Sequence, residues 1–264
     1  MDLAFFVVTP ASLYTLLYLV KQRKGCRALY CDGTHGLIAT GHKFIVMGPL
    51  YVRYRKDMND VTASLKPCGY LIALEENKAT FTASLLAIQC LALYLFGRRF
   101  VLDFGESDKT DAFLRPYIEV RNDLMPNEDD GDDTTCIPLN SLWHVLHQLT
   151  EGQPLARKFT DTEYLATARG HLQKASRSKT EMQFKKVLAL FRAQWAGDGH
   201  PEAAKHAHKG YRTFPYNNWW MNVTRVPGIT PQGSSNESYN VNRVKGSKKV
   251  ASVVSLNVSM QRFL

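Results

Sequence analysis

The sequence predicts an α/β protein in which a mixed central sheet is flanked by helices, with a helical insertion before the last helix. Two patterns predict this class. Segments rich in Ile, Val, Tyr and Phe, which are typical of strands, lie at residues 28–32, 42–54 and 70–74. Helical periodicity occupies residues 79–96, where the segment is continuously apolar, and continues from 141 to about 195. Strands that alternate with helices and then give way to helices indicate a sheet covered by helices.

The composition indicates a folded chain that favours an anionic partner. Apolar residues make up 45% of the 264 residues, which excludes a disordered protein. The 33 Lys and Arg exceed the 24 Asp and Glu, giving a net charge of +9. Such an excess is typical of proteins that bind nucleic acid or acidic membranes, although it also occurs in proteins that bind neither. The five cysteines form no C-x-x-C pair, which argues against a disulfide framework or a zinc knuckle.

The N-terminal segment 3–20 is apolar and long enough to suggest a membrane span. No Lys or Arg precedes it, so the basic start of a signal peptide is missing. Thr9 is a favoured N-cap and Pro10 is favoured in the first helical turn. We therefore predict a short strand at 5–8, then a helix at 10–20, and no membrane partner. The apolar face of this helix is expected to carry Leu13, Leu16, Leu17 and Val20.

Further elements are predicted after the apolar helix at 79–96. The sequence predicts a strand at 98–103, a helix at 107–120 and a short strand at 134–138. The acidic segment 126–133 is predicted to be a solvated loop, because it lacks the alternating acids of a calcium-binding loop. A final helix is expected from about residue 236.

Three carboxylates stand at positions where sites commonly form. Asp32 and Asp103 end predicted strands, and Glu237 begins the predicted last helix. If they meet, their repulsion requires cations, and two divalent ions would clamp both oxygens of an in-line phosphoryl transfer. Mg²⁺ or Mn²⁺ suits such an all-carboxylate site. A second interpretation stays open, in which the aspartates form turns and the glutamate complements the helix dipole.

Several motifs, in their order and spacing, resemble the transposase domain of Mutator-like elements, the MULE family. Each motif is weak alone, but together they span about residues 5 to 255. They are the F-V-V-T-P-A-S-L run at 6–13, L-Y-C-D-G-T-H-G-L at 29–37, L-E-E at 74–76, V-L-D at 101–103 with A-F at 112–113, and the W-W to V-K segment at 219–245.

The resemblance implies an RNase H-like fold with a DDE triad, and Asp32, Asp103 and Glu237 are the matching positions. Asp108 is the rival for the second position, but it falls inside a predicted helix rather than at a strand end, so Asp103 is preferred. The family implies metal-dependent cleavage and transfer of DNA strands in the nucleus, acting on transposon ends and target DNA. Transposases of this chemistry usually act as homo-oligomers, and no small-molecule cofactor is implied. The residues expected to contact DNA phosphates are Arg243, Lys245, Lys248 and Lys249.

The expected organisation is a single catalytic domain over residues 1–264. Its parts are a sheet-rich core at 1–135, a mostly helical insertion at 136–225, and a C-terminal helix at 226–264 that carries the glutamate. The family's flanking zinc-finger and SWIM modules are not expected in this chain. Ser234 and Ser235 depart from the paired asparagines of the family's turn before the glutamate. The alternatives are therefore a truncated or inactive element remnant, or a domesticated, non-catalytic DNA-binding regulator.

Overall fold

The computed structural model describes the chain in segments that fall into two compact units. The first unit comprises Met1–Ile137 with Ser235–Leu264, and the second comprises Pro138–Ser234. The residues that the structure describes are 5–22, 26–34, 42–55, 60–75, 77–107, 116, 136–211, 217–220 and 223–225. The acidic loop at 126–133 and the C-terminal helix lie outside them, as does the predicted helix at 107–120 apart from residues 107 and 116. Ser107 ends a strand, β7 (Phe104–Ser107), so the predicted helix does not begin there.

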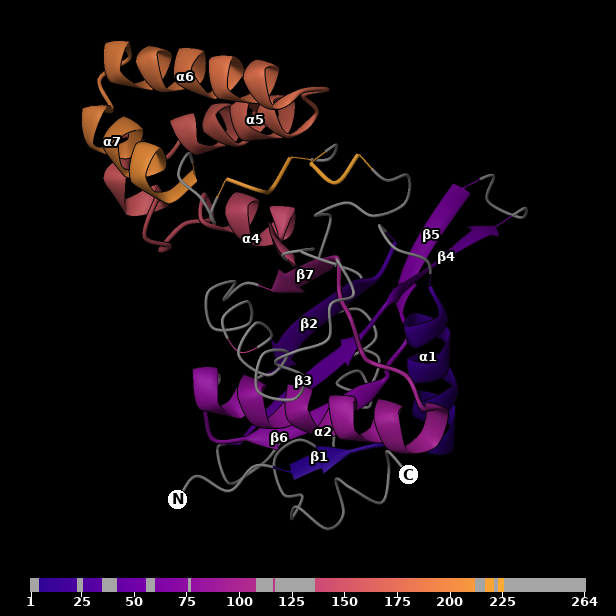
Figure 1. The fold of residues 1–264 in the computed structure, drawn as a ribbon. Helices are drawn as coiled ribbons and strands as arrows, with labels where there is room; N and C mark the ends of the chain where they lie inside the picture. Colours follow the sequence, from indigo (N-terminus) through magenta and orange to yellow (C-terminus); the bar gives the residue numbers. More distant parts are fainter. Residues whose placement is uncertain are drawn as a thin grey trace. The chain divides into compact units, whose positions relative to one another are not determined.

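A mixed six-stranded sheet, as the sequence predicted, is formed mainly by the first unit, with only the last strand, β8, extending past Ile137 (Figure 1). Its order is β1-β6-β3-β2-β7-β8. Strand β2 lies antiparallel to β3 and parallel to β7, while β6 lies antiparallel to both β3 and β1. The strands are β1 (Phe5–Val7), β2 (Ala28–Thr34), β3 (Lys43–Gly48), β6 (Gly69–Ala73), β7 (Phe104–Ser107) and β8 (Ile137–Asn140). A second, two-stranded sheet pairs β4 (Leu50–Arg55) with β5 (Asp60–Leu65).

Two helices pack on the sheet, and both begin with the caps that their sequences provide. Helix α1 (Pro10–Lys21) starts after Thr9, whose side chain accepts from the backbone N–H of Ser12, so this prediction is confirmed. Its buried residues are Ser12, Leu16 and Leu19. Of the expected face, Leu16 is confirmed and Val20 packs against the core, whereas Leu13 and Leu17 are only half-buried. Helix α2 (Lys78–Phe96) starts after the side-chain cap Asn77 and also confirms its prediction.

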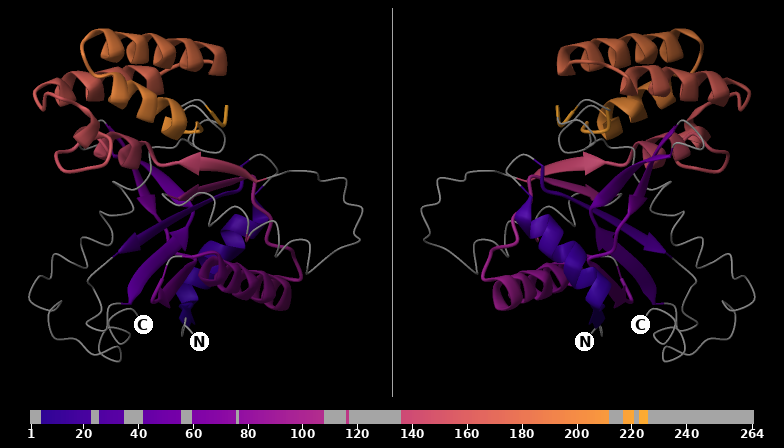
Figure 2. Two further views of the ribbon diagram at one scale, coloured as in Figure 1. Left: turned by 90° about the vertical axis from the view of Figure 1, so that its left-hand side faces the viewer. Right: turned by 90° about the vertical axis from the view of Figure 1, so that its right-hand side faces the viewer.

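The core of the first unit lies between these helices and the sheet. Figure 2 shows α1 and α2 on the same face of the sheet, and their buried side chains share one apolar cluster with the strands. Among the described residues, α2 is long and apolar enough to cross a membrane, a test that the core helix of a soluble protein also passes. The large side chains of this cluster include Leu16, Leu29, Ile45, Met47, Leu71, Phe81, Leu85 and Ile88.

The second unit is helical, as predicted for the stretch after 141. It contains α4 (Leu142–His147), a 3₁₀ turn η1 (Ala156–Lys158), α5 (Tyr164–Ser176), α6 (Glu181–Gly197) and α7 (Pro201–Tyr211). These helices surround a second apolar core that is separate from the first. The apolar stripe of α6 belongs to that core, since its side chains at 184, 188 and 195 are buried.

Two predicted strands need correction. Residues 98–103 form no strand: β7 begins only at Phe104, so Asp103 precedes the strand instead of ending it. The apolar run is buried for another reason, because Phe100 packs into the core and its N–H donates to Oε1 of Gln89 at 2.8 Å. Segment 42–54 is two strands rather than one, broken at Pro49, and the second pairs with a strand that the sequence analysis did not predict.

A buried histidine makes the stability of the helical unit dependent on pH. His171 is 8% exposed, and its ring stacks on that of Phe191 with the ring centroids 4.2 Å apart. Its Nδ1 accepts a hydrogen bond from Nε1–H of Trp195 at 3.0 Å. Burial, and then the positive charge of Lys174, lowers the pKa of His171 against the opposing effect of Asp198. The unfolded chain therefore binds a proton more readily than the folded one.

We expect the stability contributed by neutral His171 to be complete above its ordinary pKa of 6.5 and to be lost as the pH falls below it. The measurement is the thermal unfolding midpoint from about pH 7.5 to about pH 5, for the wild type and His171→Gln. The variant, which lacks the titrating ring, should show a smaller decline. Equal declines in the two proteins would contradict the assignment.

Candidate functional site

The structure places two of the predicted acids, one within β2 and the other just before the neighbouring strand β7. Asp32 lies within β2, where its backbone pairs with Val46 of β3, rather than at the end of the strand. Asp103 lies just before β7, which is the parallel neighbour of β2. The other predicted site residues lie outside the described residues: Asp108, Glu237, Arg243, Lys245, Lys248 and Lys249.

Asp103 forms a buried, bidentate ion pair with Arg27. Its Oδ1 accepts from Nη2 of Arg27 at 2.9 Å, and its Oδ2 accepts from Nε at 2.9 Å. The backbone N–H of Arg27 also donates to Oδ2, at 2.8 Å. Asp103 is 5% exposed, so this pair is made largely out of water, where charge-assisted hydrogen bonds are strong.

The same two residues also join three strands through their backbones. The carbonyl oxygen of Arg27 accepts from the N–H groups of Asp103 and Phe104, at 2.9 and 3.0 Å. The carbonyl oxygen of Asp103 accepts from the N–H of Ile137 at 2.8 Å. We call this arrangement, made by Arg27 and Asp103, the strand clamp. It ties the start of β2 to the starts of β7 and β8 and fixes the parallel register of the first two.

This geometry does not fit the expected role of Asp103 as a metal ligand. Both of its carboxylate oxygens accept hydrogen bonds from a guanidinium, and a bound cation would have to displace that partner. Within the described ranges, no three His, Cys, Asp or Glu side chains gather closely enough to hold a metal ion. The described geometry therefore gives Asp103 a structural role, and its catalytic role stays a prediction.

Cys136 shows that the negative charge of Asp103 influences its surroundings. Burial, and then the charge of Asp103, raises the pKa of the Cys136 thiol far above its ordinary value. The side chain is 3% exposed and belongs to the apolar core of the first unit. A thiol that stays protonated is neither a nucleophile nor a ready zinc ligand, so Cys136 is a core residue.

The structure adds a carboxylate that sequence reasoning passed over. Glu106 lies within β7, opposite Tyr30 of β2 in the parallel register, and is 1% exposed. Because the strand was expected to end at Asp103, Glu106 was assigned to no strand. Its burial in the strand next to β2, which carries Asp32, makes Glu106 a functional candidate, because ionisable groups with perturbed surroundings cluster at functional sites.

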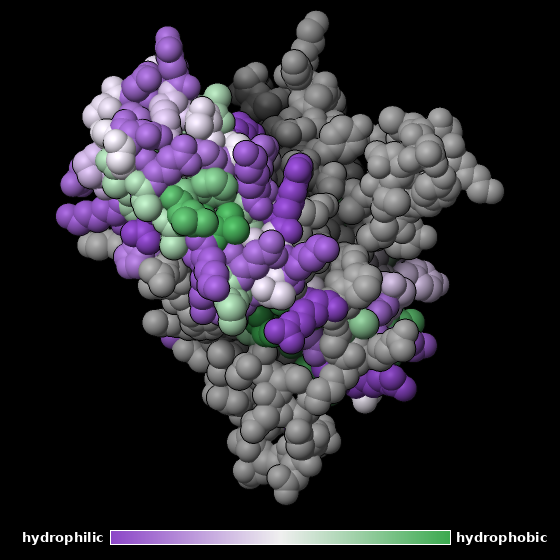
Figure 3. Space-filling view, turned by 90° about the horizontal axis from the view of Figure 1, so that it is seen from above, coloured by the Kyte–Doolittle hydropathy of each residue, from purple (hydrophilic) through white to green (hydrophobic). Residues whose placement is uncertain are grey.

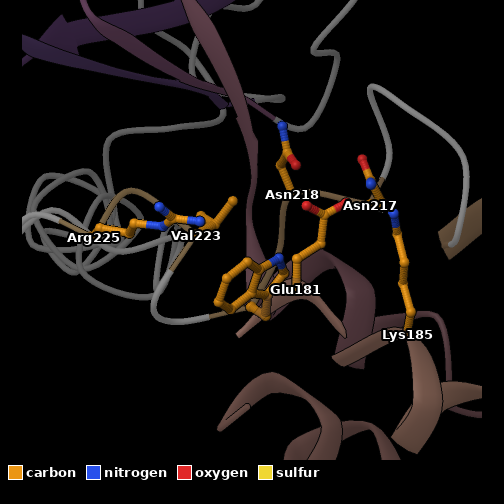
Figure 4. Close-up of a pocket in the computed structure, with 7 residues that line it drawn as sticks. Glu181, Lys185, Asn217, Asn218, Val223 and Arg225 are labelled. Carbon is orange, nitrogen blue, oxygen red and sulfur yellow. Dashed lines mark ion pairs between the residues drawn. The ribbon is translucent and has the colours of Figure 1, made fainter. Parts of the chain in front are cut away.

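The helical unit contains a polar pocket of about 430 Å³ (Figure 4). It lies between the first turns of α6 and the segment that follows α7. Its lining residues are Glu181, Lys185, Asn217, Asn218, Trp220, Val223 and Arg225. Sequence reasoning used the W-W motif only for the family resemblance and missed the pocket. The available signal was the N-N-W-W run at 217–220, in which two amides precede two large aromatic side chains.

The surface of the helical unit is largely hydrophilic around a small apolar patch (Figure 3). Two large apolar side chains of α6, Met182 and Leu190, are 67% and 69% exposed. Basic residues are numerous among the exposed side chains, which suits contact with an anionic polymer. Those of η1, α5, α6 and the turn between the last two are Arg157, Lys158, Arg169, Lys174, Arg177, Lys179, Lys185 and Lys186.

Compared with known proteins, the chain matches no protein-family model, no curated protein and no solved structure. The likeness to MULE transposases therefore rests on the sequence motifs described above.

Proposed function

We propose that this protein has an RNase H-like fold and cleaves and transfers DNA strands in the manner of a MULE transposase. The sheet topology is the observation that carries the proposal. Strands β2, β3 and β6 pair antiparallel, each with the next. The chain then forms α2 and afterwards β7, which pairs parallel with β2. An RNase H-like sheet is expected to have this strand arrangement, which supports the proposal, and β2 at its centre carries Asp32.

The proposal places the second acid at Asp108 instead of Asp103. In parallel sheets, sites form at the carboxyl ends of the strands, whereas Asp103 lies at the amino end of β7. Asp108 is the next residue in the sequence after β7. Arg27 and Asp103 are 76 residues apart, and Asp32 and Asp108 are separated by the same interval. The strand clamp fixes the parallel register at the amino ends of β2 and β7. That register would bring Asp32 and Asp108 close together at the carboxyl ends.

Glu237 completes the proposed set, and a carboxylate trio of this kind requires Mg²⁺ or Mn²⁺. When bound, such ions stabilise the charge that develops on the attacking and leaving oxygens of a phosphodiester. The chain itself would position the carboxylates. Strand β2 is paired on both sides, and the strand clamp sets the register of β2 and β7.

The proposed partner is DNA, and the proposed setting is the nucleus, with a homo-oligomer acting on transposon ends and target. The excess of nine positive charges supports this choice, because phosphate contacts supply most of the affinity for DNA without reading sequence. The exposed basic residues of the helical unit and the four basic residues from Arg243 to Lys249 are the groups proposed to make these contacts.

The test is Mn²⁺-dependent nicking of supercoiled plasmid by the purified chain, beside Asp32→Asn. We expect nicking that EDTA abolishes and that the variant reduces by about 100-fold or more, the loss typical when a group stabilising the transition state is removed. Circular dichroism and a salt-dependent gel shift confirm that the variant folds and binds DNA. Equal nicking by both proteins would contradict the proposal. DNA binding without nicking by the wild type would favour the non-catalytic regulator.

A further inference from the structure

We propose that the pocket of the helical unit binds a nucleobase with an exocyclic amino group, together with the phosphate attached to it. The base could belong to a nucleic-acid strand or to a free nucleotide, and both present the same chemistry. The volume of about 430 Å³ lies in the range of small-molecule sites. The identity of the ligand follows from three groups in the lining: a polar edge, an apolar wall and two cations.

The polar edge is formed by amide side chains, one of which has an unused acceptor. Oδ1 of Asn217 is buried and accepts no hydrogen bond. An orphaned buried acceptor costs free energy unless a ligand supplies a donor. Nδ2 of Asn218 donates to the carbonyl oxygen of Pro138 at 3.0 Å, which fixes the neighbouring amide. Asparagine is the side chain that pairs with the amino edge of adenine, so the edge suits a base carrying an amino group.

A carboxylate adds a second acceptor to the same edge. Figure 4 shows the polar ends of Glu181, Asn217 and Asn218 directed toward one another within the pocket. Glu181 pairs with Lys185 at 2.5 Å, with 52% and 44% of their side chains exposed. The acid and the amide together offer acceptors to a donor-bearing edge, whereas an aliphatic ligand would leave them unpaired.

The apolar wall is supplied by Trp220 and Val223. Trp220 is 4% exposed and stacks on Phe184, with ring centroids 6.0 Å apart and an interplanar angle of 19°. Phe184 is itself fully buried in the core of the helical unit. The indole is thus held rigidly, and with Val223 it gives the pocket an apolar side against which the rim of a planar base can pack.

Two cations lie on opposite sides of the pocket. Figure 4 shows Lys185 and Arg225 flanking the amide edge. Arg225 is exposed and has a positive φ of 54°, a conformation that few residues other than glycine adopt. With one carboxylate against two cations, the lining has a net positive charge, which favours a phosphate-bearing ligand over a neutral or cationic one.

The experiment measures binding by fluorescence anisotropy in EDTA, so that cleavage plays no part. The probes are a labelled DNA duplex with one extrahelical adenine and the same duplex fully paired, with adenosine monophosphate as competitor. We expect about tenfold tighter binding of the extrahelical probe, the discrimination that one good base contact supplies. Displacement by the mononucleotide would identify a free nucleotide as the ligand, and preference without displacement would identify the strand.

Matched variants separate the pocket from general charge. Asn217→Leu should remove the preference for the extrahelical base while leaving affinity for the paired duplex unchanged. Lys186 is an exposed cation of α6 that does not line the pocket, so Lys186→Gln should weaken the binding of both probes equally. An unchanged preference in Asn217→Leu, or neither preference nor mononucleotide binding in the wild type, would overturn the proposal.

The inference rests on the proposed function in one respect only, namely that the bound base could belong to a DNA strand. Nicking by Asp32→Asn tests the catalytic proposal, and base binding by Asn217→Leu tests the pocket. If the former variant nicks normally while the latter loses base binding, catalysis is refuted and the pocket stands. The reverse pair of results refutes the pocket alone.

Discussion

Replacement of Asp103 by alanine should lower the free energy of unfolding by about 3–5 kcal/mol, the cost of breaking a buried ion pair from one side. The loss is large because the guanidinium of Arg27, whose side chain is 12% exposed, would keep its charge without the carboxylate. Three hydrogen bonds to the two carboxylate oxygens would disappear together. Urea denaturation followed by circular dichroism measures the change.

The double variant Arg27→Met/Asp103→Asn is the matched control. It removes both charges, while the amide oxygen of the new asparagine remains available to the backbone N–H at position 27. Replacing a whole buried pair costs much less than removing one partner, so the double variant should recover most of the lost stability. A single variant as stable as the wild type, or a double variant no better than the single, would refute the strand clamp.

Asp108→Asn should reduce Mn²⁺-dependent nicking by about 100-fold or more, which is the second large effect that we expect. The reason is that Asp108 follows the carboxyl end of β7, the end at which the site of a parallel pair forms. The amide keeps the size of the side chain but removes the charge that would hold a cation. Nicking rates at equal protein concentration, with the unfolding midpoint measured in parallel, give the result.

The comparison that matters is between the two aspartates. Asp108→Asn should lose activity while its unfolding midpoint stays near that of the wild type. Loss of activity accompanied by a matching loss of structure would remove the support for a catalytic role. Normal nicking by Asp108→Asn would show that the second acid is a different residue, with Glu106 the next candidate because it is buried in β7 opposite Tyr30.

Elements with local signals were predictable from the sequence. The Thr9 cap followed by Pro10 specified the start of α1, and the apolar run after Asn77 specified α2. Such signals depend only on residues that are close in the sequence, so they can be recognised without knowing the tertiary contacts. The mixed sheet with a following helical unit was predictable for the same reason, because strand and helix periodicities differ along the chain.

Features that depend on distant partners were not predictable. The run before Asp103 has the residue types of a strand, but pairing of β7 with β2 starts at Phe104. Side chains at 100 and 102 are buried as irregular chain in the core. The ion pair joins residues 76 positions apart, and nothing local to Asp103 indicates Arg27 as its partner. A buried acid before a strand is therefore easily mistaken for a catalytic one.

The candidate pocket was unpredictable for a similar reason. Its lining combines the first turns of α6 with residues 217–225, which are brought together by the core of the helical unit. The amide pair and the aromatic pair at 217–220 were visible in the sequence, but not the charged residues that complete the lining. Only the folded arrangement shows that Oδ1 of Asn217 is buried without a partner.

The most direct test of the central claim is the nicking rate of the Arg27→Met/Asp103→Asn double variant. We claim that Asp103 holds the strands in register and that Asp32 and Asp108 act on the phosphodiester. The double variant has no carboxylate at 103 but is expected to remain folded, so it should nick plasmid DNA in Mn²⁺ within about threefold of the wild type. A folded double variant that is as inactive as Asp32→Asn would contradict the claim and return Asp103 to the site.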